Sequence, residues 1–157
     1  MALNMDWVTE IYLGARLLLA CTLGGAIGWE RELHGRVAGI RTYVAVAVGA
    51  CAFALIAAHV PDRTNPHVIA SGVVTGIGFL GAGVILREKG EIVGLTTAAT
   101  LWATASSGLA VGYGMYVVGF VVAIVVFCLL AAHHLPFWRR LKPTSPNSDS
   151  SGSADCC

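Results

Sequence analysis

The residues best suited to chemistry gather between residues 30 and 42, which read E-R-E-L-H-G-R-V-A-G-I-R-T. Carboxylates and arginines this close can form ion pairs, and arginines can bind anionic lipid headgroups. One or two carboxylates with water can hold magnesium. However, Glu30 and Glu32 would face apart on a helix, and the arginines oppose a cation, so we predict no metal site. We define the polar corner as the five candidate residues of this stretch, Glu30, Arg31, Arg36, Arg41 and Thr42.

Glu30 and Arg41 stand at the facing ends of two consecutive apolar stretches. They could pair across the turn, and a buried pair would fix the geometry of the turn, because losing one partner would strand the other charge. Headgroup binding by the arginines is the simpler alternative. The sequence leaves both readings open.

Two further polar features lie inside apolar stretches. Arg16 is a charge within an apolar run. A charge in a membrane span is functional by default, although a long side chain can also reach the headgroups, here with Asp62 as a partner. The other feature is a polar stripe spaced by four residues, for which helix packing is favoured over the wall of an ion path. Its members are Thr96, Thr100 and Thr104.

Glycines are spaced for helix contact. Gly24-x-x-x-Gly28 and Gly72-x-x-x-Gly76 place small residues on one helix face, which lets a neighbouring backbone come close. The string G-x-G-x-x-G at 76–81 also matches a dinucleotide fingerprint, but no strand precedes it. We therefore predict a helix-contact face, which a leucine at Gly76 should block, formed by Gly72, Gly76, Gly78, Gly81 and Gly83.

Composition sets the class of protein that must position these residues. The chain has 157 residues, 56% hydrophobic and only 12% charged, with a net charge of +1. Disordered proteins and nucleic-acid binders are excluded by this balance. A transmembrane helix needs about 20 apolar residues, and the sequence predicts an all-α polytopic membrane domain over 1–135 and a disordered tail over 136–157. The five expected spans are 11–29, 42–60, 67–86, 95–113 and 115–135.

The basic residues predict the orientation in the membrane. Lys and Arg are enriched in cytoplasmic loops. One side has Arg63 alone, so we expect the N-terminus outside and the C-terminus in the cytoplasm, with the first span retained rather than cleaved. The other side carries Arg31, Arg36, Arg41, Arg87, Lys89, Arg139, Arg140 and Lys142.

A faint internal repeat links the first two spans to the next two. A shift of 56 residues matches Gly25 to Gly81 and Arg31 to Arg87, and after a gap Gly39 matches Gly94. Both segments join two spans on the same side of the membrane. The sequence therefore predicts a parallel repeat of two hairpins, with chance similarity of glycine-rich spans as the alternative.

The stretches at 30–42, 71–87 and 94–114 together resemble the MgtC/SapB family, and the resemblance covers about residues 14 to 130. It implies a multi-pass bacterial inner-membrane protein linked to growth in low magnesium. It also implies a regulator rather than a pump, with the proton-driven ATP synthase as an associated partner. Many members carry a folded cytoplasmic domain where this chain has a short tail, which weakens any role that depends on that domain.

The expected function is therefore a non-enzymatic membrane regulator linked to magnesium homeostasis and membrane energetics. No acid–base–nucleophile set is visible, and we expect no catalytic residue and no cofactor. The expected partners are the lipid bilayer, a second copy of the chain and another membrane protein, reached by helix–helix contact. The alternative is a transporter or channel for magnesium or another small solute.

Overall fold

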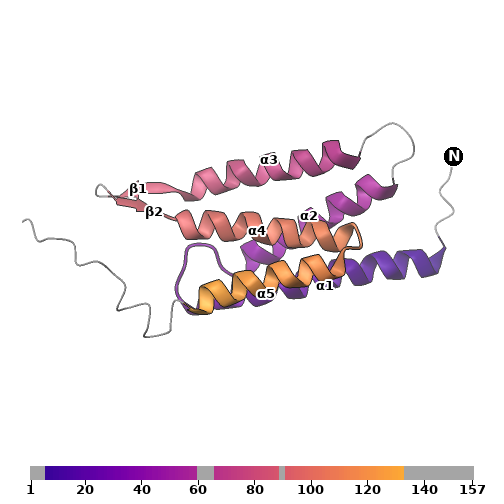
Figure 1. The fold of residues 1–157 in the computed structure, drawn as a ribbon, viewed down its shortest axis with the longest axis horizontal. Coiled ribbons are helices and arrows are strands. Elements are labelled where there is room, and N and C mark those ends of the chain that lie inside the picture. The colour runs from indigo at the N-terminus through magenta and orange to yellow at the C-terminus, as the bar shows by residue number, and fades with distance from the viewer. Residues whose placement is uncertain (1–5, 60–65, 89–90, 133–157) are drawn as a thin grey trace, which may run out of the picture.

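The computed structural model describes residues 6–59, 66–88 and 91–132. The described residues form five helices and one pair of short strands (Figure 1). The expected all-α architecture is confirmed, and each expected span falls on one helix. In chain order the elements are α1 (Trp7–Leu33), α2 (Ile40–His59), α3 (Pro66–Val84), β1 (Leu86–Glu88), β2 (Glu91–Val93), α4 (Leu95–Gly112) and α5 (Tyr116–Ala132).

The first helix is longer than the apolar stretch that predicts it. It continues past Trp29 to Leu33, so the first residues of the polar corner are helical. It ends where Gly35 adopts a φ of +60°, and the N–H groups of the two residues from Gly35 onward bond back to carbonyls of the last turn. The α4 helix ends in the same way at Gly114, whose φ is +81°. Both ends are Schellman motifs, which need a left-handed residue after the helix. The helix therefore ends at a suitable glycine rather than where the apolar run stops.

The connection between α3 and α4 contains a short antiparallel hairpin, which the expectation of an all-helical chain does not include. The third span is expected to reach residue 86, but α3 ends at Val84 and Leu86 already pairs with Val93. Alternating apolar and charged residues in so short a segment are easily read as the end of a span. The turn at 89–90 and the tail at 136–157 lie outside the described residues.

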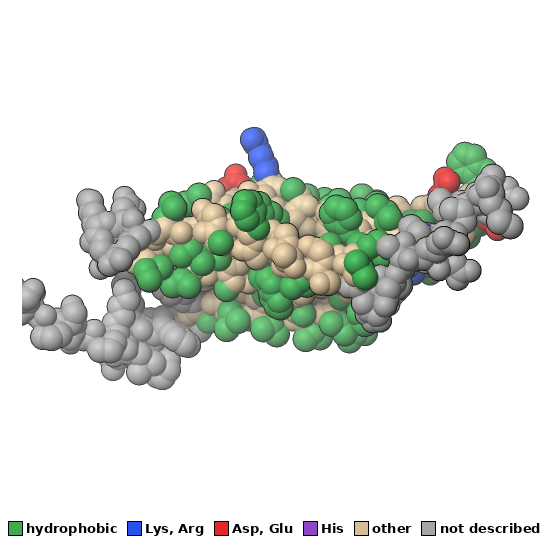
Figure 2. Space-filling view, turned by 90° about the horizontal axis from the view of Figure 1, so that it is seen from above, with side chains coloured by type: hydrophobic (Ala, Val, Ile, Leu, Met, Phe, Trp, Pro, Cys, Tyr) green, Lys and Arg blue, Asp and Glu red, His purple; other side chains and the backbone are tan. Residues whose placement is uncertain are grey.

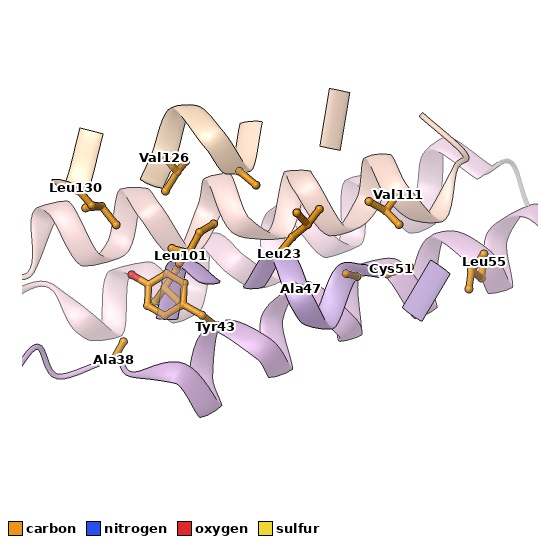
Figure 3. Packing of buried hydrophobic residues seen from close by; sticks show 13 residues of the cluster. Leu23, Ala38, Tyr43, Ala47, Cys51, Leu55, Leu101, Val111, Val126 and Leu130 are labelled. Carbon is orange, nitrogen blue, oxygen red and sulfur yellow. The ribbon is translucent and has the colours of Figure 1, made fainter. Parts of the chain in front are cut away.

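The core lies where α1, α2 and α4 meet, and α4 packs against all four other helices. Figure 3 shows Tyr43 and Cys51 of α2 facing buried residues of the neighbouring helices. Glycine allows this closeness. A Cβ at Gly28 would lie 2.5 Å from the Cα of Ile40, and a Cβ at Gly112 would lie 2.7 Å from the carbonyl oxygen of Cys51. The predicted small-residue packing of α1 is confirmed.

Large hydrophobic side chains cover the outside of the bundle. Hydrophobic residues spread over the face drawn in Figure 2, where few charged side chains interrupt them. The outer face of α5 exposes Val117, Phe120 and Ile124, as expected for a helix at the lipid-facing rim. Both α1 and α2 are long and apolar enough to cross a bilayer, while α3 and α5 supply shorter apolar helices. An apolar surface this extensive needs an apolar environment.

The two connections within the hairpins lie at the same end of the bundle. The α1–α2 turn, the β1–β2 hairpin and the C-terminal end of α5 all lie at this end, and the α4–α5 turn lies at the other (Figure 1). A parallel repeat requires this arrangement. The repeat itself and the side of the membrane on which this end lies stay predictions.

Candidate functional site

The polar corner begins in the last turns of α1, where a charged pair is buried. Glu30 and Arg31 are each only 5% exposed. The Nε of Arg31 donates to Oε2 of Glu30 at 2.8 Å. The Nδ1 of His34 lies 2.6 Å from the main-chain oxygen of Glu30 and 3.2 Å from its Oε1. Because a buried charge is stable only when it is paired, this arrangement holds both side chains in place.

The pairing between Glu30 and Arg41 that the sequence suggests is wrong. The Glu30 carboxylate contacts Arg31 and His34, which lie on its own helix or just beyond its end. Arg41 is exposed at the start of α2. A helix that continues past Trp29 turns the Glu30 side chain inward, where it is buried beside Arg31, whereas the Arg41 side chain stays on the exposed side of α2.

Glu32 has a separate role at the start of α2. Its Oε2 accepts a hydrogen bond from the backbone N–H of Ile40 at 2.9 Å. The first N–H groups of a helix have no partner within the helix, and a carboxylate there also complements the helix dipole. Glu32 therefore caps α2, and it faces away from Glu30 as the helical spacing predicts.

A polar pocket of about 410 Å³ opens beside the buried pair. Its lining joins the end of α1, β2, the first turn of α4 and the end of α5. Arg31 and Arg36 of the polar corner line it, while Arg41 and Thr42 lie outside it. We call this the polar pocket. Its remaining lining residues are His34, Ile92, Gly94, Leu95, Thr96, Thr97, Leu129 and Leu130.

The polar stripe of α4 is mostly used for packing. The Thr100 hydroxyl lies 2.9 Å from the carbonyl oxygen of Thr96, and the Thr104 hydroxyl donates to that of Thr100 at 2.8 Å. Both side chains are buried, whereas Thr96 is exposed at the polar pocket. Hydroxyls that bond to their own helix are typical of close-packed membrane helices.

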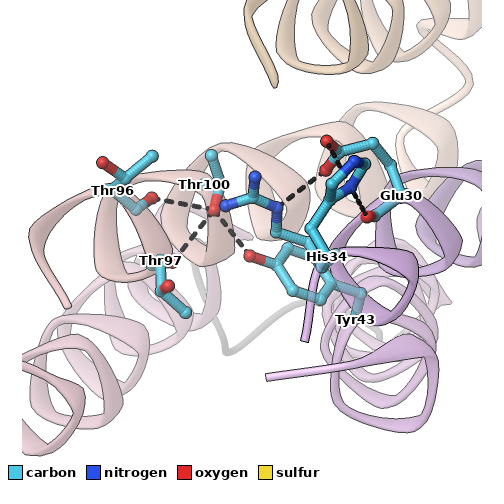
Figure 4. Close-up of polar contacts among 7 residues, drawn as sticks. Glu30, His34, Tyr43, Thr96, Thr97 and Thr100 are labelled. Carbon is cyan, nitrogen blue, oxygen red and sulfur yellow. Dashed lines mark hydrogen bonds and ion pairs between the residues drawn. The ribbon is translucent and has the colours of Figure 1, made fainter. Parts of the chain in front are cut away.

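Sequence reasoning missed Tyr43, which is fully buried in α2. Its hydroxyl lies 2.6 Å from that of Thr100 (Figure 4). The single proton of Thr100 is directed at carbonyls of its own helix, so Tyr43 is the donor. A tyrosine in an apolar helix needs a partner for its hydroxyl, and this requirement was a signal for a polar contact between α2 and a neighbour.

Arg16 ties α1 to the turn between α4 and α5. Its Nη1 donates to the carbonyl oxygen of Gly112 at 3.0 Å, and its guanidinium lies 5.5 Å from the ring centre of Tyr116. The end of a helix presents unpaired carbonyls and a partial negative charge, and Arg16 binds there. Asp62, the partner considered from the sequence, lies outside the described residues.

The helix-contact face of α3 is open. A Cβ at Gly72, Gly76, Gly78 or Gly83 would meet nothing within 4 Å, and Gly81 alone of the five faces a neighbour, with Ala98 at 3.6 Å. Part of this face borders a groove of about 710 Å³ between α2 and α3. We call it the open groove. It is lined by Thr42, Ala45, Val46, Gly49, Ala50, Phe53, Ile69, Gly72, Val73, Gly76, Ile77 and Leu80.

Metal ligands do not cluster in the described part of the chain, where no group of three His, Cys, Asp or Glu side chains comes together. Among the described side chains, the pocket is instead lined by two arginines, one of them paired with the buried Glu30. This lining can hold an anion more readily than a cation.

Comparison with known proteins assigns the chain to a family. The MgtC family model matches residues 17–135. The chain belongs to the MgtC family. The matched range contains the buried pair, the polar pocket and the open groove. Membership of the MgtC family and the apolar helices together identify the chain as a membrane protein.

Two kinds of relative are similar to this MgtC-family chain. The protein named "Putative magnesium transporter YhiD" from Escherichia coli (strain K12) is 41% identical over 136 residues, which cover 80% of this chain and 62% of the relative. Protein MgtC of Brucella abortus (strain 2308) is 44% identical over 111 residues, covering 71% and 47%. Protein MgtC of Salmonella typhimurium (strain 14028s / SGSC 2262) is 44% identical over 112 residues, covering 71% and 48%. The chain therefore spans about half to three-fifths of these relatives, and no solved structure matches it.

Proposed function

We propose that this MgtC-family protein is a non-enzymatic, multi-pass inner-membrane regulator that acts by helix–helix contact with another membrane protein. Its role is linked to magnesium homeostasis and membrane energetics. The proton-driven ATP synthase is the first partner to test, on the family resemblance. In this proposal the open groove receives a transmembrane helix of the partner.

The observation that carries the proposal is the contrast among glycines within one chain. Gly28 receives α2, and Gly112 also faces α2. Gly72 and Gly76 have the same four-residue spacing, border the open groove and meet nothing. Because small residues at this spacing admit a helix closely, the occupant that fits the open groove is a helix with an apolar face.

The link to magnesium rests on the relatives. One similar protein carries magnesium transport in its name, and this name favours a second candidate function, a transporter or channel for magnesium. The arginines of the polar pocket oppose a divalent cation, and the buried hydroxyls of Thr100 and Thr104 are bonded within their own helix. These features support the regulator over the transporter.

Photo-crosslinking in native membranes tests the regulator. A photoreactive phenylalanine analogue replaces Phe53, which is 53% exposed and lines the open groove. The matched control replaces Phe120, which is 46% exposed on the outer face of α5. We expect an adduct with another membrane protein from position 53 that is absent from position 120. An adduct at twice the mass of the chain would instead mean self-association, and equal adducts from both positions would contradict a specific groove.

Magnesium flux tests the transporter. The purified protein is placed in liposomes that enclose a magnesium-sensitive dye, and a membrane potential is imposed. We expect no flux above that of empty liposomes. Flux that is abolished by Thr100→Leu and kept in Val117→Leu, an exposed position on α5, would overturn the regulator in favour of transport.

A further inference from the structure

The polar pocket at the end of α1 has the chemistry of an anion site, and we propose that it binds a phosphate group. The group is carried by a lipid headgroup or is free in solution. The volume of about 410 Å³ falls within the range of about 300 to 1,000 Å³ typical of small-molecule sites. The inference concerns a different surface from the open groove and does not depend on the proposed regulator.

Arg31 is the residue on which the inference rests. It lines the pocket and is only 5% exposed. Its Nε is bonded to Glu30, and in the described part of the chain no acceptor bonds its two terminal nitrogens. These two nitrogens are therefore available to a ligand that enters the pocket. The planar guanidinium can offer paired N–H groups to phosphate oxygens, so a phosphate in the pocket would satisfy them.

The first turn of α4 supplies a second set of donors to the same pocket. Gly94 begins the helix in a left-handed conformation without a side-chain cap, and Leu95, Thr96 and Thr97 line the pocket. The first N–H groups of a helix lack partners within it. In α2 one such group, the N–H of Ile40, donates to the Glu32 carboxylate. A helix N-terminus that faces an arginine-lined pocket favours an anion both by its donors and by its dipole.

The remaining lining is consistent with a phosphate that carries an organic group. Glu30 offsets the charge of Arg31 and fixes its position, so Arg36 and the start of α4 provide the excess of positive charge. An apolar wall of Ile92, Leu129 and Leu130 completes the pocket. This wall can contact the glycerol and acyl part of a lipid, while the polar side can accept a free phosphate.

Binding measurements on the full chain, purified in a nonionic detergent, distinguish the sources. Inorganic phosphate, dihexanoyl phosphatidylglycerol and dihexanoylglycerol are titrated separately, and affinity is read from calorimetry and from the melting temperature. We expect saturable binding of at least one phosphate ligand and none of dihexanoylglycerol, which has the same acyl chains without the phosphate. Binding of the phospholipid alone identifies a headgroup site, and binding of inorganic phosphate identifies a site for soluble phosphates.

Two matched charge removals localise the site. Arg36→Gln removes an exposed arginine that lines the pocket, and Arg41→Gln removes an exposed arginine that lies outside it. We expect Arg36→Gln to weaken phosphate binding about tenfold, as for loss of one charged hydrogen bond, and Arg41→Gln to leave it unchanged. Both substitutions are at the surface, so the fold should tolerate them.

The proposal is overturned if neither phosphate ligand binds to the folded protein. It is also overturned if Arg36→Gln and Arg41→Gln weaken binding equally, because binding would then reflect general surface charge. Arg31→Gln should lower affinity further than Arg36→Gln. If Arg31→Gln is folded and binds phosphate as the wild type does, the pocket is not the site.

Discussion

In the α1–α2 hairpin, Gly24 and Gly28 face α2 so closely that a Cβ at either position would collide with it. In the α3–α4 hairpin, Gly72 and Gly76 have the same spacing, yet a Cβ at either would meet nothing within 4 Å. The four-residue spacing of glycines therefore indicates a surface on which a helix can pack. Whether a helix of the same chain packs there depends on the fold of the whole chain. Where no helix of the chain packs on it, the surface is open to a helix of a partner in the membrane.

The two hairpins also begin their second helices differently. Gly39 precedes α2, and the Glu32 carboxylate caps the helix. Gly94 precedes α4 in a left-handed conformation, without a side-chain cap. These glycines correspond in the predicted repeat. The first hairpin thus caps one N–H of its second helix with its own carboxylate, while in the second hairpin the start of α4 faces the polar pocket.

The largest contrast is expected between Gly28→Leu and Gly76→Leu. A Cβ at Gly28 would lie 2.5 Å from the Cα of Ile40, so the backbones must separate, whereas Gly76 has open space. We expect Gly28→Leu to lower the free energy of unfolding by about 3 kcal/mol or more and Gly76→Leu to change it by about 0.5 kcal/mol or less. Denaturation by SDS in mixed micelles measures both.

The open space at Gly76 changes the expectation drawn from the sequence, in which a leucine at this position blocks packing within the chain. In our proposal Gly76→Leu instead blocks the partner, so the crosslink from Phe53 should disappear while folding is kept. Equal destabilisation by the two leucines would show that α3 packs as tightly as α1.

In the second contrast, we expect the substitution in the α3–α4 hairpin to be the more destabilising one. Gly94 has a φ of +90°, and a Cβ there would lie 3.0 Å from the carbonyl carbon of Val84. The atoms nearest to a Cβ at Gly39 belong to the Glu32 side chain, with Oε2 at 2.8 Å; this side chain can shift, at the expense of its hydrogen bond to Ile40. We expect Gly94→Ala to cost about 2 to 3 kcal/mol from strain and crowding, and Gly39→Ala less. Thermal unfolding in detergent compares them, and a larger loss for Gly39→Ala would contradict this assignment.

The third contrast concerns the contact of Arg16 with the end of α4, which joins the two hairpins at the end of the bundle opposite the polar pocket. Arg16→Gln removes the guanidinium that bonds the carbonyl oxygen of Gly112 and lies over Tyr116. We expect a loss of about 2 kcal/mol, as for a hydrogen bond to a charged group. Arg41→Gln removes the same charge from an exposed site and should cost far less. The midpoints of SDS denaturation provide the measurement, and equal midpoints would assign Arg16 to the headgroups.

Much of the fold could be predicted from the sequence. Hydrophobic runs of membrane length locate the five helices because each helix must keep its backbone groups paired in an apolar solvent. The ends are less predictable, since α1 continues to a glycine that can terminate it. The β1–β2 hairpin was missed because three-residue strands leave almost no periodic signal.

The candidate site could be predicted only in part. Charge density alone singled out the segment that contains Glu30 and Arg31, but not which of its charges are buried. Pairing of Glu30 with Arg31 rather than Arg41 depends on where α1 ends. The polar pocket needs α4 and α5 to meet the end of α1, and such long-range contacts are not encoded in local spacing.

The smallest effect is expected from the hydrogen bond that joins the two hairpins at the buried ends of α2 and α4. Tyr43→Phe removes the hydroxyl that donates to Thr100 at 2.6 Å but leaves the ring in the core. Thr100 keeps its own bond to the helix backbone, so no buried donor is stranded. We expect a loss of about 1 kcal/mol, against no change for Tyr12→Phe at a position 63% exposed. Melting temperatures of the two variants in one detergent test the difference. If Tyr43→Phe is neutral, this hydrogen bond contributes nothing to stability, and apolar packing and the Arg16 contact hold the two hairpins together.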